Sequence, residues 1–299
     1  SIIKRTIPDF LPKSAKAIIT QSFSYNEIFK QWLAKCVDKG ALLIGLQHGG
    51  VNNIFKRNQT EEHEVSICDK YFSWGSTSKK FSKKIEPLFP TKMINQKKIG
   101  SSNSLETILF CSTSFPRYLN RFWLGVCNNY NYEQYISLQF RFVDSVNYKD
   151  KILIRPFMDD YGWDYYERWN ARYPSIVINN KNLFMHELEK CKVFICDNIQ
   201  TVWLESLFVN KPTIMYLDID KYCFTDKTKY YIDKLKSVKI MHDTPEAAAK
   251  TLNNVYSDIN KWWKNSELQQ VRASFCNFFI NEPDHSLTSF LNLSKNIFD

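Results

Sequence analysis

One histidine of this chain has neighbours that suit proton transfer. His48 follows the apolar run 42–46 and Gln47, and it precedes the adjacent glycines Gly49 and Gly50. Glycine lets a backbone approach a ligand closely, and imidazole titrates near neutral pH, as a general base must. We therefore predict that His48 is a catalytic base and that Gln47, Gly49 and Gly50 contact the substrate. The alternative is a turn in which the histidine ring bonds to backbone.

An acidic segment follows, Thr60-Glu61-Glu62-His63-Glu64, and we expect it to form a loop. A single histidine among carboxylates lacks the spacing of a metal site, so no metal is predicted. We expect Glu64 to be the carboxylate that orients His48. Solvated surface charge is the alternative for this segment.

Polar residues follow three predicted strands of the second half, 107–111, 151–155 and 193–196. Ligands of open parallel sheets bind at the carboxyl ends of the strands. An anion there would meet arginine side chains and a helix N-terminus, which favours phosphate. We predict a nucleotide site composed of Ser114, Arg117, Arg155, Asp160, Asn198, Thr201 and Glu205.

Within this predicted site, Arg155 is expected to hold phosphate and Glu205 to hold ribose hydroxyls. The alternatives are a surface ion pair for Arg155 and a solvated helix residue for Glu205. The chain has no P-loop and no Gly-x-Gly-x-x-Gly motif, which excludes a kinase-like or typical dinucleotide site.

The elements that must position these residues alternate between β-branched runs and amphipathic stretches, a pattern typical of βαβ units. We predict strands at 17–20, 42–46, within 65–73, and at 107–111, 151–155, 175–178, 193–196 and 213–217. We predict helices at 26–39, 132–146, 161–172, 183–191, 201–209, 247–256, 268–279 and 287–297. Thr244 and Pro245 are the expected N-cap and first position of the helix that follows them.

The polar segment 92–106 is the best linker candidate, so we expect two Rossmann-like parallel-sheet halves that meet near residue 100. The first half, with three predicted strands, is incomplete for a doubly wound sheet. Its missing strands would precede Ser1 or come from a partner chain.

The composition is that of a folded protein, with 44% apolar and 24% charged residues in 299, which excludes disorder as the main state. No apolar run is long enough to span a bilayer, and the N-terminus lacks a signal peptide. The eight cysteines lack zinc spacing, so we expect buried thiols in a cytoplasmic protein.

The net charge of +9 suggests an anionic partner. Basic residues are densest in a cluster formed by Lys79, Lys80, Lys83, Lys84, Lys92, Lys97 and Lys98. The cluster is either a solvated face or a contact with the inner face of the cytoplasmic membrane. No nucleic acid is expected, because the chain carries no nucleic-acid-binding motif.

An ordered set of motifs resembles a family of transferases encoded in bacterial O-antigen and other surface-polysaccharide loci. The resemblance runs over about 16–279 and is to the C-terminal half of members about twice as long. The motifs are Leu46-Gln-His-Gly-Gly50, Glu62-His-Glu64, Asp69-Lys-Tyr-Phe-Ser-Trp-Gly75, Phe115-Pro-Arg-Tyr118, Asp160-Tyr-Gly-Trp163, Trp203-Leu-Glu-Ser-Leu-Phe-Val-Asn-Lys-Pro212 and His242-Asp-Thr-Pro-Glu246. Where the family usually continues the glycine pair with Asn-Tyr-Gly, this chain has Val51-Asn52-Asn53. Where small hydroxylated residues usually precede the nucleotide-binding helix, it has Asp197-Asn198-Ile199-Gln200.

More distantly, the pattern is similar to GT-B enzymes such as capsular Kdo transferases and CDP-glycerol glycerophosphotransferases. This resemblance implies a GT-B-like α/β fold. Residues 1–100 would be the C-terminal part of an acceptor-side domain, and 101–299 a donor nucleotide-binding domain with C-terminal helices. It also implies that His48 faces the cleft and acts on the acceptor, and that Arg155-Pro156 holds phosphate. Asn198, Thr201 and Glu205 would contact the nucleotide.

The expected function is transfer of a sugar or polyol-phosphate group from a nucleotide-activated donor to a surface-polysaccharide precursor. The donor would be a substrate, with CMP- and CDP-linked compounds among the candidates, and no resident cofactor is expected. The acceptor would be a glycan or lipid-linked glycan. The alternative is a non-catalytic subunit that binds nucleotide-sugar or assists assembly at the membrane surface.

Overall fold

The computed structural model describes residues 11–21, 23, 26–75, 83–94, 96, 98–99, 105–118 and 131–280. The chain divides into two compact units. Unit 1 consists of Ser1–Asn53, Arg57–Ile94 and Asn277–Asp299, and unit 2 of Ile54–Lys56 and Asn95–Cys276. The sequence suggests a single boundary near residue 100. The structure in addition assigns three early residues to unit 2 and the end of the last described helix to unit 1.

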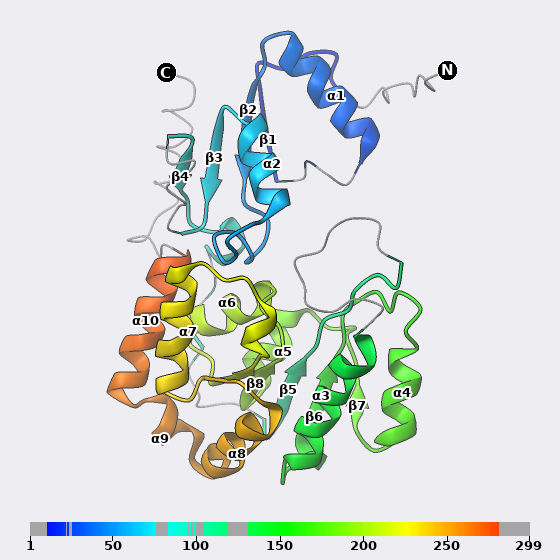
Figure 1. Cartoon of the computed structure of the whole chain (residues 1–299), viewed down its shortest axis with the longest axis vertical. Coiled ribbons are helices and arrows are strands. Elements are labelled where there is room, and N and C mark those ends of the chain that lie inside the picture. Colours follow the sequence, from blue (N-terminus) through cyan, green and yellow to red (C-terminus); the bar gives the residue numbers. More distant parts are fainter. Residues whose placement is uncertain are drawn as a thin grey trace. The chain divides into compact units, whose positions relative to one another are not determined.

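Unit 1 contains a parallel sheet in the order β1-β2-β3-β4 (Figure 1). The strands are β1 (Ala17–Thr20), β2 (Leu42–Leu46), β3 (Lys70–Ser73) and β4 (Ile85–Pro87), and the helices are α1 (Glu27–Asp38) and α2 (Gln59–Ile67). The Asn26 side chain caps α1 by accepting the N–H groups of Ile28 and Phe29, as preferred at an N-cap.

The loop predicted at 60–64 is wrong, because these residues lie in α2. Asn58 caps this helix by accepting the Glu61 N–H at 3.2 Å. The strand expected within 65–73 is β3, which occupies 70–73 after the end of α2.

Unit 2 contains six parallel strands in the order β10-β9-β8-β5-β6-β7. They are β5 (Ile108–Cys111), β6 (Ile152–Arg155), β7 (Val177–Ile178), β8 (Val193–Cys196), β9 (Thr213–Tyr216) and β10 (Met241–His242). The chain first moves from β5 towards β7 and then continues on the other side of β5. This is the order of a doubly wound sheet, in which the crevice at the carboxyl ends of β5 and β8 is the expected ligand site.

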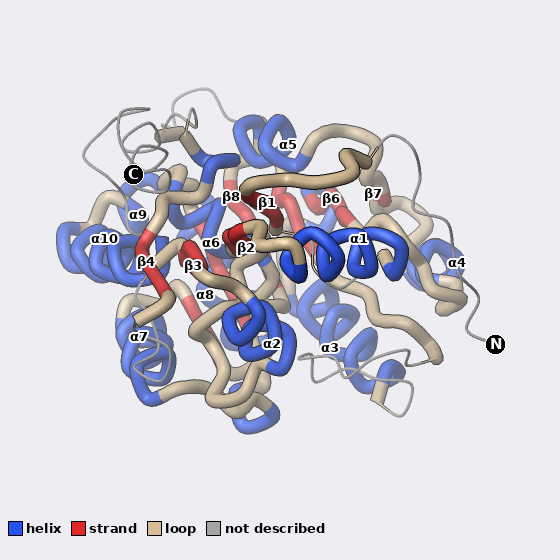
Figure 2. The backbone as a smooth tube through the Cα atoms, turned by 90° about the horizontal axis from the view of Figure 1, so that it is seen from above, coloured by secondary structure: helices blue, strands red, loops and turns tan. Residues whose placement is uncertain are grey.

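The helices of unit 2 flank this sheet, with α3 and α8 on one side and α5 on the other (Figure 2). They are α3 (Tyr132–Ser145), α4 (Tyr165–Arg172), α5 (Phe184–Lys190), α6 (Thr201–Phe208), α7 (Asp226–Ser237), α8 (Pro245–Val255), α9 (Ile259–Trp263) and α10 (Ser266–Ile280), the last of which ends in unit 1. Short 3-10 turns lie at η2 (Thr91–Met93), η3 (Lys149–Lys151), η4 (Ile219–Lys221) and η5 (Tyr256–Asp258). One hydrophobic core joins a sheet face to α3, α4 and α8 and includes Phe110, Phe142, Trp169, Ile195 and Leu252.

The α/β class with parallel sheets is therefore confirmed. Helix α8 begins as predicted, with Pro245 first and Thr244 accepting the Ala247 N–H. The predicted helix at 287–297 lies outside the described residues. Among the described helices, none is long and apolar enough to cross a membrane.

All seven described cysteines are free thiols, and six of them are buried; Cys223 is exposed. Cys127 lies outside the described residues.

Candidate functional site

The His48 turn of unit 1 is held by the side chain before it. Gln47 is buried; its amide donates to the Gly49 carbonyl at 2.6 Å and accepts the Trp74 N–H at 2.8 Å. The Ser73 hydroxyl also donates to it, at 3.1 Å. The predicted substrate contact of Gln47 is thus replaced by bonds that fix the turn. His48 itself is exposed just beyond the carboxyl end of β2.

The end of this turn has a left-handed backbone. Asn53 has φ 61° and occupies the position at which the resembling family usually has its third glycine. Asparagine is among the few residues that adopt this conformation readily. Its N–H donates to Glu61 Oε2 at 3.0 Å, and its side chain donates to the Ser73 hydroxyl at 3.1 Å. The substitution for glycine therefore keeps a glycine-like turn.

Two buried carboxylates of α2 lie behind the turn. The Tyr71 hydroxyl donates to Glu64 Oε2 at 3.0 Å and accepts from the Asn52 amide at 2.9 Å. Glu64 Oε1 is buried and has no hydrogen-bond partner among the described residues. Burial raises the pKa of Glu64 to about 7, and burial likewise raises the pKa of Glu61 to about 7.

The prediction that Glu64 orients His48 is therefore corrected. The Glu64 carboxylate bonds to Tyr71 and not to the imidazole, because it points from α2 into the interior while His48 is exposed. It supports the turn through Tyr71 and Asn52.

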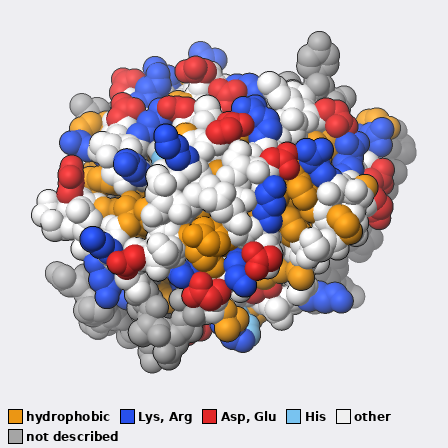
Figure 3. Space-filling model, turned by 90° about the horizontal axis from the view of Figure 1, so that it is seen from below, with side chains coloured by type: hydrophobic (Ala, Val, Ile, Leu, Met, Phe, Trp, Pro, Cys, Tyr) orange, Lys and Arg blue, Asp and Glu red, His pale blue; other side chains and the backbone are white. Residues whose placement is uncertain are grey.

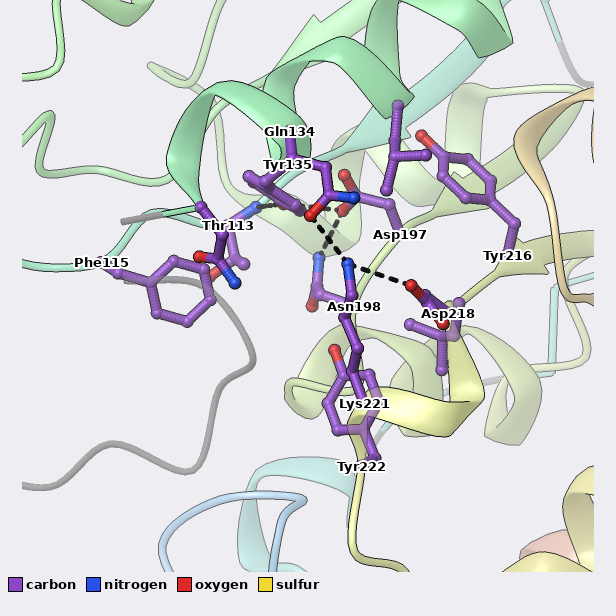
Figure 4. A pocket seen from close by; sticks show the side chains of 13 residues that line it. Thr113, Phe115, Gln134, Tyr135, Asp197, Asn198, Tyr216, Asp218, Lys221 and Tyr222 are labelled. Atoms are coloured by element: carbon purple, nitrogen blue, oxygen red, sulfur yellow. Dashed lines mark hydrogen bonds and ion pairs between the residues drawn. The ribbon is translucent and has the colours of Figure 1, made fainter. Parts of the chain in front are cut away.

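In unit 2, a pocket lies at the carboxyl ends of β5, β8 and β9, and we call it the β5–β8 pocket (Figure 4). It is lined by Thr113, Phe115, Asn131, Gln134, Tyr135, Leu138, Asp197, Asn198, Tyr216, Leu217, Asp218, Lys221 and Tyr222. Its volume is about 40 Å³, enough for two or three water molecules.

The interior of this pocket is a fixed polar network around Asp197. This buried carboxylate accepts from the Tyr135 hydroxyl at 3.0 Å, the Gln139 amide at 2.7 Å and the Asn198 amide at 3.1 Å. The Tyr135 hydroxyl also accepts the Thr113 N–H at 3.1 Å. Burial raises the pKa of Asp197 to about 6. The network joins the ends of β5 and β8 to α3.

The sequence prediction missed Tyr135, Gln139 and Asp197. The available signal was the four-residue spacing of Tyr135 and Gln139, which places them on one face of the predicted helix 132–146.

The cation of the pocket lining is Lys221. Its ammonium group lies 3.0 Å from Asp218 Oδ2 and donates to the Gln134 side-chain carbonyl at 3.0 Å (Figure 4). It is exposed, so a ligand anion can reach it.

Arg155, the predicted phosphate clamp, is already paired. One of its terminal guanidinium nitrogens lies 2.5 Å from Glu187 Oε2, and the two side chains are 15% and 6% exposed. The charge on which the prediction depended is neutralised in the fold. Arg155 connects β6 to α5, which corrects its predicted role.

Ser114, Arg117 and Asp160 meet at one loop outside the pocket lining. The Asp160 carboxylate accepts the N–H groups of Trp163, Asp164 and Tyr165 at 2.8, 2.9 and 2.8 Å. The Asp160 side chain thus fixes the turn before α4, whose N-cap Asp164 has a left-handed backbone (φ 53°), so this helix begins at Tyr165 and not at the predicted 161. Ser114 donates to the Asp160 carbonyl, and Arg117 donates to the Gly162 carbonyl.

The remaining predicted contacts lie where β8 leads into α6. Asn198 lines the pocket, and its side-chain oxygen accepts the Gln200 N–H at 3.1 Å. Thr201 is the first residue of α6 and Glu205 lies one turn later, both half-buried. Their roles toward a nucleotide stay predictions.

Only part of the lysine cluster belongs to the described residues. Lys84 donates to the carbonyls of Ser66 and Cys68 at the end of α2, and Lys98 donates to the Phe208 carbonyl at 2.9 Å. Acidic and basic side chains are intermixed on the face seen in Figure 3.

Among the described residues, no three His, Cys, Asp or Glu side chains are grouped to hold a metal ion.

The doubly wound unit with a polar pocket at its strand ends defines an α/β protein with a Rossmann-like unit. The sequence matches the model of the LIC12162 family transferases over residues 2–292, and the chain belongs to this family. The resemblance to transferases is thus confirmed. No curated protein matches the sequence.

Among solved structures, the catalytic domain of cholesterol-alpha-glucosyltransferase from Helicobacter pylori is similar at 12% identity. The match covers 59% of this chain and 99% of that chain, with a TM-score of 0.29. The α/β class therefore rests on the strands and helices described above.

Proposed function

We propose that the protein is a GT-B-type glycosyltransferase. It would move a sugar or polyol-phosphate group from a nucleotide-activated donor to a bacterial surface-polysaccharide precursor. The main support is that a chain of a transferase family has a polar pocket at the switch point of a doubly wound sheet. That is where such sheets bind nucleotides.

In this proposal each unit has one chemical task. His48 removes the proton of the acceptor hydroxyl, the requirement of an inverting transfer. Asn198, Thr201 and Glu205 contact the donor nucleotide. Lys221, whose pair with Asp218 is exposed whereas the Arg155–Glu187 pair is buried, meets charge on the leaving phosphate. The nucleotide, CMP or CDP among the candidates, arrives with the donor.

Calorimetric titration with CMP, CDP, UDP and GDP tests the donor half of the proposal. We expect one nucleotide to bind tightly and the same base to define the donor in a transfer assay. If none of the four binds, the donor assignment is wrong.

The acceptor half is tested with His48→Ala. Loss of a general base lowers turnover by about 10²–10⁴-fold, while nucleotide affinity should stay at the wild-type value. The control is His63→Ala on the exposed face of α2, which should keep full turnover. Full activity of His48→Ala would exclude it as the base.

A non-catalytic subunit that binds nucleotide-sugar is the second candidate. It is favoured by the bond of Glu64 to Tyr71 instead of His48 and by the pairing of Arg155. Tight nucleotide binding without transfer to any glycan acceptor would support it. Cosedimentation with anionic vesicles would test the proposed membrane contact in either case.

A further inference from the structure

A three-residue segment from the first half of the sequence is built into unit 2. Phe55 forms an isolated antiparallel bridge with Phe224. The Lys56 N–H donates to the Cys223 carbonyl at 2.8 Å, and the Thr225 N–H donates to the Ile54 carbonyl at 3.0 Å. The backbone of 54–56 is thus bonded on both sides of residue 224.

The side chains make the attachment specific. The Phe55 ring stacks on Tyr222, with centroids 6.1 Å apart, and on Phe224, at 5.7 Å. Tyr222 and Phe224 stack on each other at 5.1 Å. Phe55 is 8% exposed and Phe224 is 0% exposed. We call these three residues the aromatic stack.

The aromatic stack adjoins the β5–β8 pocket. Tyr222 belongs to both, and Lys221, which directly precedes it, is the cation of the pocket lining (Figure 4). Both follow β9 through the short turn η4. A single 3-10 turn is weak support for two ligand-facing side chains, so the position of Tyr222 depends on the rings packed against it.

We infer that Phe55 is a positioning residue of the β5–β8 pocket, which acts through Tyr222 to hold the η4 side of the pocket for a nucleotide. The inference rests on the proposed function. It assigns part of the donor site to the chain segment that follows the His48 turn, seven residues after the histidine.

The test is a double-mutant cycle on nucleotide affinity, measured by calorimetry in the full chain. Phe55→Ala removes two ring contacts and should weaken the nucleotide that the wild type binds by about tenfold. Phe55→Tyr keeps the ring and should stay within about threefold of wild type. Phe55→Leu keeps apolar volume without a stacking ring, so it reports on stacking even if the alanine variant fails to fold.

The second arm asks whether Phe55 acts through Tyr222. If it does, Phe55→Leu with Tyr222→Ala should lose no more affinity than Tyr222→Ala alone. The matched control is Phe157→Leu, which removes an exposed ring stacked on Tyr161 at 6.2 Å, outside the pocket lining. It should bind as wild type.

The outcomes are separable. If wild type binds none of the four nucleotides, the proposed function fails and this inference with it. If wild type binds and folded Phe55→Leu binds equally well, only the inference is overturned. Additive losses in the double variant would likewise overturn it, because Phe55 would then act independently of Tyr222.

Discussion

The Arg155–Glu187 ion pair shows how one neighbour changes the role of a residue. A buried pair that loses one partner leaves an uncompensated charge in the interior, which costs about 3–5 kcal/mol. Glu187 is 6% exposed and also accepts from the Asn182 amide at 3.3 Å. The pair therefore has a structural role, joining the carboxyl end of β6 to α5.

We predict that Arg155→Ala lowers the free energy of unfolding by about 3–5 kcal/mol and leaves nucleotide affinity unchanged under conditions where it is folded. Urea denaturation and calorimetry measure the two effects. The control is Arg141→Ala, whose partner Glu246 is 44% exposed and whose loss should matter little. Selective loss of affinity for phosphate-bearing ligands would restore Arg155 to the donor site.

The buried glutamates of α2 make stability depend on pH. Their pKa values are raised to about 7 from an ordinary value of 4.5, so the folded state binds their protons more tightly than the unfolded state. The resulting contribution to the free energy of unfolding is fully present below about pH 4.5 and is lost as the pH rises through 7.

We therefore expect the free energy of unfolding to fall between pH 5 and pH 8, by on the order of 1.4 kcal/mol per pKa unit at most. Glu61→Gln and Glu64→Gln should each flatten this slope in urea titrations at several pH values. Glu27→Gln, an exposed glutamate of α1, should leave it as in wild type. Unchanged slopes in both buried-site variants would contradict the assignment.

At the scale of elements, the sequence pattern predicted β1, β2 and β8 with their observed bounds, because short, largely apolar runs between amphipathic stretches are distinctive. Helix α2 was not predicted from the sequence, and the reason is physical. Glu61 and Glu64 face the interior beside Val65, so carboxylates occupy positions where a periodic pattern requires apolar residues. Burial of an acid is decided by tertiary partners such as Tyr71.

The same limit applied to the site. The strand ends could be located from sequence, and Asn198, predicted at one of them, lines the pocket, while its contact with a nucleotide stays a prediction. The partners that redirected Arg155 and Gln47 could not be found, because Glu187 and Trp74 are 32 and 27 residues away in the chain. Such pairings depend on strand order, which spacing alone does not fix.

The turn between β2 and α2 should depend on residue 53. A left-handed alanine is strained by about 1–2 kcal/mol relative to glycine. Asn53→Gly should therefore be more stable than Asn53→Ala, although both lose the bond to Ser73. Thermal unfolding of the two variants measures the difference, and equal stability would show that φ at this position is not restrained.

For the whole molecule, Ile54–Lys56 makes unit 2 discontinuous in sequence. A fragment that begins at residue 95 lacks Phe55 and exposes Tyr222 and Phe224. We expect it to be less stable than the same fragment with residues 54–56 attached through a flexible linker. Chemical denaturation compares the two, and equal stability would show that the segment adds nothing to unit 2. The domain bounds predicted from the sequence, 101–299, omitted this segment, since a three-residue bridge between positions 55 and 224 has no periodic signature.

The segment 54–56 also limits where two related genes can recombine and still give a folded protein. A recombination event near residue 100 would separate Phe55 from Tyr222 and Phe224, although all three pack in one stack. A hybrid that exchanges the second half to acquire a new donor would then combine mismatched rings. Positions 55, 222 and 224 should consequently vary together among relatives, and viable chimaeras should have crossover points that keep residues 54–56 with the unit that they complete.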